Sequence, residues 1–222
     1  MRKALALMFC LTGISLFAHT DAAQLAPGAR EQLNALLNKP AMVQKAVVTP
    51  LGKNWFRLET DAHVITDEAG FKQVADVLND LENSEKIFGG KVSKLQGNII
   101  SRQGDETIVD FTMISFAPLG IQIKTPYRAS VRTVERTESK IYIEIKQLAS
   151  DSSSNKDIKD LFAVRYAEEI TISGKKYTYI RIYAKDDVNA SILPGARGIL
   201  ENNSAPSNIE ALQLVIAAAK AR

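Results

Sequence analysis

The stretch SAPSNIEALQLVIAAAKAR, residues 204–222, decides how the rest of the chain is arranged. Pro206 suits the first turn of a helix, and Ser204 or Ser207 can cap the free N–H groups there. Apolar side chains then follow at spacings of three and four residues and share one helical face: Ile209, Leu212, Val215, Ile216 and Ala219. A short helix with one apolar face needs a partner surface to be stable. The stretch therefore predicts a C-terminal helix that packs on another layer of the fold.

The middle of the chain supplies that layer, because its apolar and polar residues alternate with a period of two. The alternation predicts six strands, over residues 92–103, 106–117, 121–136, 140–148, 161–173 and 176–188. Turn signals such as Gly104-Asp105 separate them. Short turns between consecutive strands predict antiparallel neighbours in chain order.

A strand and two helices precede these six strands. Residues 43–65 alternate as a strand, with a turn signal at residues 50–52, and residues 66–81 carry a helical apolar stripe. A second short helical piece at residues 80–90 is stopped by its two terminal glycines. A long antiparallel sheet with one buried face curls, and its concave side must be covered. We therefore expect an α+β fold in which a curved antiparallel sheet of about seven strands grips the last helix.

Two stretches carry a resemblance to a known family. They are FKQVADVLNDLENSEKIFGGKVSKLQG, residues 71–97, and FTMISFAPLGIQIKTPYRASVRTVER, residues 111–136. They resemble the START-like, helix-grip superfamily (SRPBCC), also described as the polyketide cyclase/dehydrase and lipid-transport superfamily. That family has an aspartate-containing turn and then a short second helix that ends in an aromatic residue, which would be Phe88 in this sequence. The resemblance covers residues 43–222 in pattern and order, and it carries no catalytic residue across.

The resemblance implies a hydrophobic or amphipathic ligand held between the concave sheet and the last helix. The side chains expected to line this pocket lie at alternate strand positions and on the helix: Val109, Phe111, Met113, Ile123, Tyr127, Ile143, Val164, Tyr166, Glu168, Tyr179, Arg181, Leu212 and Ile216. Apolar walls with a few polar groups are typical of ligand pockets. The alternative is that the same side chains fill a solid core, because periodicity does not distinguish the two.

Two charged positions share a strand face with apolar neighbours. Glu168 follows Val164 and Tyr166 along one strand, and Arg181 lies between two tyrosines on the next. A buried charge is costly unless it is paired, so the two are expected to meet each other or a ligand group. The alternative is that this face is solvated near the strand ends.

The first 22 residues have the layout of a secretory signal peptide. Arg2 and Lys3 precede an uncharged apolar run over residues 4–18, and small residues suited to cleavage follow. The run is shorter than the roughly 20 residues of a membrane-spanning helix, which disfavours an uncleaved anchor. A lipoprotein signal at Cys10 is rejected, because only nine residues precede it and the small neighbour it requires is missing.

Cleavage after Ala22 predicts a mature chain of residues 23–222 in the periplasm or outside the cell, with no transmembrane segment. Within it, residues 23–41 are expected to form an N-terminal helical extension, with Leu33, Leu36 and Leu37 on one side, rather than a flexible spacer. Residues 42–222 are expected to form one helix-grip domain, a size that allows a substantial core.

Composition narrows the function classes. The mature chain has no cysteine and a single histidine, His63, on the polar side of its strand, so a cysteine nucleophile is excluded and a metal site is not expected. The formal net charge of +3 for the whole chain gives no electrostatic case for nucleic acid. No cofactor motif is present.

Three functions remain open. We favour an extracytoplasmic binding or carrier protein for a hydrophobic or lipid-like small molecule. The first alternative is a partner-binding module with a filled core. The second is a cyclase- or hydratase-type enzyme that uses Tyr127, Tyr166, Glu168 and Arg181, and we weigh enzyme activity below binding. In the carrier, Gly195 and Gly198 are expected to be hinges for movement of the last helix.

Overall fold

A computed structural model describes residues 42–91, 93–116, 122–148, 157–172, 174–189 and 196–222. The strands are β1 (Met42–Gly52), β2 (Trp55–Thr66), β3 (Ser93–Gln103), β4 (Glu106–Phe116), β5 (Gln122–Arg136), β6 (Lys140–Gln147), β7 (Ile158–Ile172) and β8 (Lys175–Asn189). The helices are α3 (Phe71–Leu78), α4 (Ser84–Ile87) and α5 (Ala196–Lys220). The expected leader and the helical extension at residues 23–41 lie outside the described residues.

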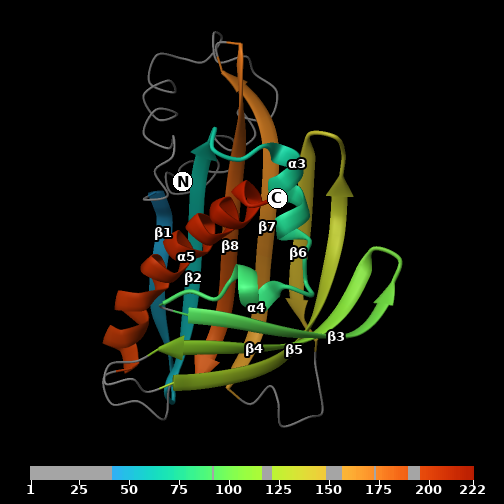
Figure 1. Ribbon diagram of the computed structural model, residues 1–222. Helices are drawn as coiled ribbons and strands as arrows, with labels where there is room; N and C mark the ends of the chain where they lie inside the picture. Colours follow the sequence, from blue (N-terminus) through green and yellow to red (C-terminus); the bar gives the residue numbers. More distant parts are fainter. Residues whose placement is uncertain (1–41, 92, 117–121, 149–156, 173, 190–195) are drawn as a thin grey trace, which may run out of the picture.

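The eight strands form a single antiparallel sheet in the order β1-β2-β8-β7-β6-β5-β4-β3. The strands from β3 to β8 are neighbours in chain order, as their short turns predict. The sheet bends strongly, so that β3, β4 and the first part of β5 cross beneath the helices, while the second part of β5 turns upright beside β6 and β1, β2, β7 and β8 also stand upright (Figure 1). The architecture is α+β and is consistent with the expected helix-grip arrangement.

Among the described residues the sheet has eight strands rather than about seven, because residues 43–65 form a hairpin and not one interrupted strand. Gly52 pairs with Trp55, which leaves Lys53 and Asn54 as a two-residue turn. Both turn residues have positive φ, 49° and 65°, as a type I′ hairpin turn requires. The turn therefore follows the Pro-Leu-Gly signal at residues 50–52 instead of coinciding with it.

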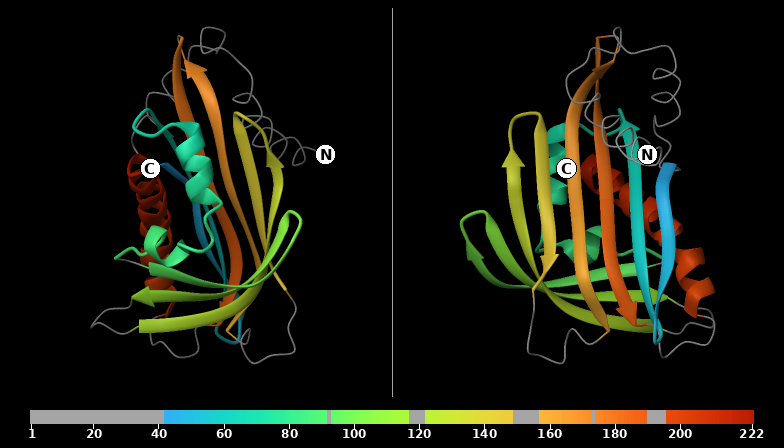
Figure 2. Two further views of the ribbon diagram at one scale, coloured as in Figure 1. Left: turned by 45° about the vertical axis from the view of Figure 1, so that its right-hand side comes forward. Right: turned by 180° about the vertical axis from the view of Figure 1, so that it is seen from behind.

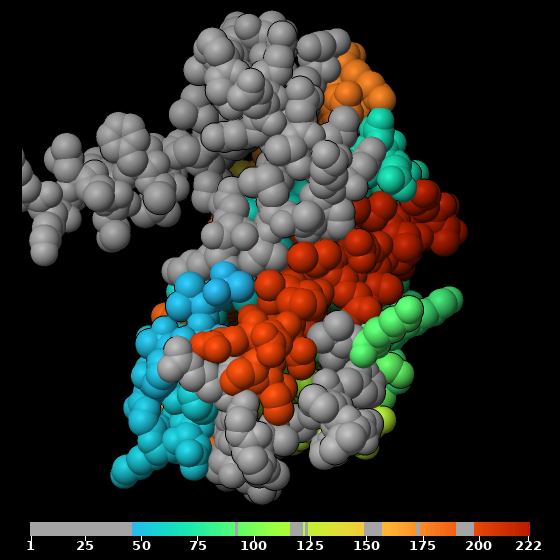
Figure 3. Space-filling view, turned by 90° about the vertical axis from the view of Figure 1, so that its left-hand side faces the viewer, coloured from blue at the N-terminus to red at the C-terminus, as the bar shows by residue number. Residues whose placement is uncertain are grey.

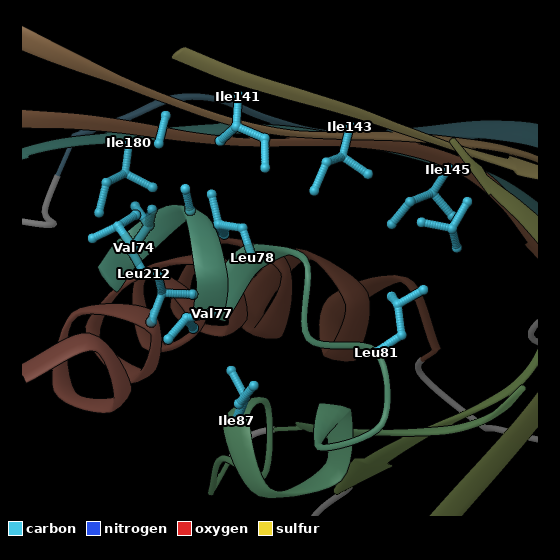
Figure 4. Packing of buried hydrophobic residues seen from close by; sticks show 14 of the residues in the cluster. Val74, Val77, Leu78, Leu81, Ile87, Ile141, Ile143, Ile145, Ile180 and Leu212 are labelled. Carbon is cyan, nitrogen blue, oxygen red and sulfur yellow. The ribbon is translucent and has the colours of Figure 1, made fainter. Parts of the chain in front are cut away.

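The described helices α3, α4 and α5 all lie on the concave face of the sheet (Figure 2). Figure 4 shows the contact between the layers, with isoleucines of the sheet directed at aliphatic side chains of α3 and α5. Ile141, Ile143, Ile180 and Leu212 are all completely buried in this core. Full burial of each such side chain contributes about 1.5–3 kcal/mol, so the contact between the helices and the sheet is a principal source of stability.

The last helix begins earlier than expected, at Ala196 rather than near Ser204. Pro206 consequently lies inside α5, where its missing N–H removes one backbone hydrogen bond of the helix. Gly198 lies in the first turn of α5 and not in a connecting loop, so the structure does not support it as a loop hinge. Gly195 lies outside the described residues. The helix expected over residues 66–81 is also shorter than expected, since α3 occupies only Phe71–Leu78.

Candidate ligand cavity

A cavity of about 310 Å³ lies between the concave face of the sheet and the first two-thirds of α5. Most of its wall is apolar and comes from the strands β2 to β8 and from α5, with Leu58, Leu95, Met113, Ile145, Ile182 and Leu214 among the lining residues. The space-filling view shows α5, in red, lying across the molecule between the blue of β1 and the green of β3 (Figure 3). The cavity thus lies between the sheet and the last helix, where the family resemblance implies a ligand.

The helix α5 has two roles along its length. Leu200, Ser204, Ser207, Ala211 and Leu214 recur at three- and four-residue spacing and form the stripe that roofs the cavity. The buried residues near its end lie on a different stripe and pack into the core: Leu212, Val215, Ile216 and Ala219. The start of α5 therefore covers the cavity, and its end anchors the helix.

A carboxylate on α5 ties the roof to the segment before β3. The Glu210 Oε1 atom accepts a hydrogen bond from the backbone N–H of Lys91 at 2.7 Å. Its side chain also lies against Gly90, where a Cβ atom would come within 2.1 Å of Glu210 Oε2. Phe88 and Leu95, on either side of this segment, line the cavity. Glu210 thus fastens the helix at one edge of the cavity.

Arg165, on β7, is a charged residue of the cavity wall that the sequence analysis did not select. It lines the cavity and is 5% exposed. Its Nη1 atom donates to the backbone carbonyl of Leu78 at 3.1 Å, at the end of α3, and its guanidinium lies 4.4 Å from the centre of the Phe88 ring. Burial lowers the pKa of the Arg165 guanidinium to about 10, and the electrostatic interaction with Tyr127 offsets part of this decrease. The guanidinium therefore stays charged at neutral pH.

Asp186, on β8, is another charged residue of the cavity wall, which also includes Lys94, Asp157 and Glu210, and like Arg165 it is buried. Burial raises its pKa to about 7, and the neighbouring Asp187 carboxylate adds to this rise. The register of β7 against β8 shifts between Lys159 and Phe162, and Asp160 in this irregular region has a positive φ of 53°. Such bulges are enriched beside functional sites, where they re-aim side chains.

The predicted pocket residues divide into several groups. Met113 and Tyr127 border the cavity, and Val164 lies at its wall, although the side chain of Val164 shares the outer strand face with Tyr166. Val109, Phe111 and Ile143 are buried in the packed core beside it, as are Leu212 and Ile216 on α5. The side chain of Ile123 lies outside the described part of the structure.

The remaining four predicted residues lie on the opposite, outer face of the sheet: Tyr166, Glu168, Tyr179 and Arg181. The strand register shows this. Ile180 belongs to the core and pairs with the core residues Val64 and Ala167. The next residue, Arg181, points to the other face and pairs with His63 and Tyr166. Both faces of β7 and β8 carry apolar or aromatic residues, so alternation alone did not indicate which face is concave. The expectation that these four side chains face the cavity is therefore corrected.

On the outer face, the charged groups pair differently from the expected Glu168–Arg181 contact. Arg181 binds both carboxylate oxygens of Asp61, at 2.9 and 2.8 Å, and Glu168 accepts a 2.6 Å hydrogen bond from the Tyr166 hydroxyl. His63 is buried, with Nδ1 hydrogen-bonded to the Tyr179 hydroxyl and Nε2 2.9 Å from Asp61 Oδ1. Burial favours a higher pKa for the Asp61 carboxyl, but its contacts with His63 and Arg181 hold the pKa below its ordinary value.

Comparison with known proteins leaves the family open. No protein-family model matches the sequence, and neither does any curated protein. Among solved structures, the chain is similar to TTHA0849 from Thermus thermophilus, at 12% identity and a TM-score of 0.48, over 73% of this chain and 97% of that one. It is also similar to the di-domain ARO/CYC StfQ of the steffimycin biosynthetic pathway, at 14% identity and a TM-score of 0.45, over 75% of this chain and 52% of that one.

A third similar structure is the hypothetical protein jhp0584 from Helicobacter pylori, at 14% identity and a TM-score of 0.41, over 68% of this chain and 85% of that one. The assignment of a helix-grip arrangement rests on the sheet and helices described above. None of the described helices is both long enough and apolar enough to span a membrane.

Proposed function

We propose that this protein binds a hydrophobic or lipid-like small molecule between the sheet and α5, and that it does so outside the cytoplasm. The observation that carries the proposal is the cavity of about 310 Å³ with a largely apolar wall. Its volume lies within the range of about 300–1,000 Å³ that is usual for small-molecule sites. The layout of residues 1–22 as a secretory leader supports the proposed location.

The alternative of a filled core accounts for only part of the interior. The rings of Phe111 and Tyr127 do meet near the centre, with their centroids 5.5 Å apart. The cavity nevertheless persists beside them, along Met113 and the small side chains Ala163 and Ala184. A partner-binding module would have no need for this space.

The four residues that the sequence analysis assigns to an enzyme do not form one site. Tyr127 borders the cavity, whereas Tyr166, Glu168 and Arg181 lie on the outer face of the sheet. Four groups divided between two faces of a sheet cannot act on one substrate. Binding is therefore the activity that the cavity supports best.

A ligand would enter by movement of the first part of α5. This part roofs the cavity, lacks one backbone hydrogen bond at Pro206, and is fastened to the rim through Glu210. The end of α5 stays anchored through Leu212 and its neighbours in the core. The proposed motion opens the roof without unfolding the domain.

Filling the cavity tests this function. Ala211 lines the cavity, so Ala211→Phe should lower the affinity for a neutral apolar dye, N-phenyl-1-naphthylamine, by about tenfold or more. Ala217 is exposed on the same helix, and Ala217→Phe serves as the matched control with wild-type affinity. Failure of the wild-type protein to bind the dye, or unchanged binding by Ala211→Phe, would overturn the proposal.

A further inference from the structure

Arg165 is a buried cation that forms no ion pair within the described part of the chain. Its one hydrogen bond there goes from Nη1 to the Leu78 carbonyl at 3.1 Å. A guanidinium carries five N–H donors, and a charge removed from water is costly unless it is paired. Arg165 lines the cavity, so its remaining donors are available to a molecule that occupies the cavity. This combination points to a negatively charged ligand group.

Tyr127 provides a second unused donor in the same wall. It is 6% exposed, and its hydroxyl makes no hydrogen bond to any residue that the structure describes. Burial raises the pKa of the Tyr127 phenol, so the hydroxyl keeps its proton and can donate it in a hydrogen bond. The charges of both Arg165 and Asp186 act on this phenol, which places it within electrostatic reach of both.

Asp186 makes the two ends of the cavity wall different in charge. On β8, Ile182 pairs with Arg165, and Asp186 lies four residues further along the same strand face. Four residues of strand span about 13 Å, so the carboxyl group and the guanidinium belong to different ends of the cavity wall. An anionic group near Asp186 would meet another carboxyl, whereas one near Arg165 would meet a cation that has no ion pair with the residues that the structure describes.

We propose that the ligand is an amphipathic acid whose anionic head group is bound by Arg165 and the Tyr127 hydroxyl, while its apolar chain lies along the rest of the cavity. This inference rests on the proposed binding function and specifies the ligand class. A water molecule occupies about 30 Å³ of liquid, so a cavity of about 310 Å³ holds roughly ten groups of that size. A single chain of about ten carbons is therefore the appropriate probe.

The test compares decanoic acid with 1-decanol, which has the same chain length without the charge. Both compete with the neutral dye for the full mature chain at pH 8. Charge-assisted hydrogen bonds typically favour the charged partner by about ten- to one-hundredfold, so decanoate should bind at least about tenfold tighter than decanol. Decyl phosphate is a third arm, which distinguishes a phosphate head group from a carboxylate.

Two variants test whether Arg165 and Tyr127 cause the preference for decanoate. Arg165→Met keeps an unbranched side chain without charge, and it should abolish the preference for decanoate while leaving decanol within about threefold of wild type. Tyr127→Phe should weaken decanoate binding about three- to tenfold. If Arg165→Met does not fold, because it loses the Leu78 contact, the wild-type ratio and Tyr127→Phe decide the question.

The possible failures are distinguishable. Equal affinity of the wild-type protein for decanoate, decyl phosphate and decanol would overturn the acid-binding inference and leave the carrier function in place. An unchanged preference for the acids in Arg165→Met would do the same. If the dye itself does not bind, the proposed function falls, and this inference falls with it.

Discussion

The carboxylate of Glu210 accepts a hydrogen bond from the backbone N–H of Lys91 at 2.7 Å, and it thereby connects the roof of the cavity to the segment that enters β3. The contact joins residues far apart in sequence, on the two elements that must separate if a ligand is to pass between them. Its strength therefore bears on the rate of ligand exchange more than on the stability of the whole domain.

Removing this contact should speed ligand release. In Glu210→Ala, the dissociation rate of a bound apolar dye should rise several-fold, and the free energy of unfolding should fall by only about 0.5–1.5 kcal/mol. Stopped-flow fluorescence measures the rate, and Gln213→Ala, at an exposed position on the same helix, is the control. A rate equal to that of wild type in Glu210→Ala would show that α5 does not open at this edge.

Gly97 and Gly198 should respond to alanine in opposite directions. At Gly97, on β3, a Cβ atom would lie 2.8 Å from Ser84 Oγ and 3.1 Å from the Phe111 ring, so Gly97→Ala should destabilise the protein by about 1–3 kcal/mol. At Gly198, no atom lies within 4 Å of an added Cβ, so Gly198→Ala should stabilise the protein by about 0.5–1 kcal/mol. Denaturant unfolding measures both. Destabilisation by Gly198→Ala would argue against a helix that begins at Ala196.

The buried Asp186 should make stability depend on pH. Its pKa rises from an ordinary value of 3.8 to about 7 on folding, so the folded state favours the protonated form. Stability from this group is complete below about pH 4 and is lost as the pH rises to about 7, by a total on the order of 4 kcal/mol. Asp186→Asn should remove this loss.

The measurement is the free energy of unfolding of both proteins at pH 5 and pH 8. The variant should gain stability relative to wild type as the pH increases between these values. Asp105→Asn, at an exposed turn position, controls for the general effect of removing one negative charge. A stability difference that does not change with pH would contradict a protonated Asp186 in the folded protein.

Much of the fold was predictable from local patterns. Burial of one face of a strand or helix produces a regular spacing of apolar residues in the sequence. This spacing predicts the strands β3 to β8 and the helical stripe that ends in Val215, Ile216 and Ala219. The β1–β2 turn was misplaced because Lys53 and Asn54 adopt positive φ without the usual glycine. The early start of α5 was missed because proline is common in first turns, although Pro206 lies inside this helix.

The cavity wall was less predictable, because β7 and β8 have apolar residues on both faces. Tyr166 and Tyr179 are placed in the cavity wall by the sequence analysis, whereas the strand register places them on the outer face. The concave face carries the smaller Ala163 and Ala184 near Arg165, and these small side chains help to leave space for a ligand. A row of small residues that includes one buried charge is the sequence signal that could have identified this face.

Native mass spectrometry of residues 23–222, purified without detergent from the compartment in which the protein resides, tests the account most directly. The account predicts a reproducible added mass that disappears after organic extraction and returns when the protein is incubated with a lipid extract. A bare protein mass, with no gain after that incubation, would contradict the carrier function and favour a partner-binding module.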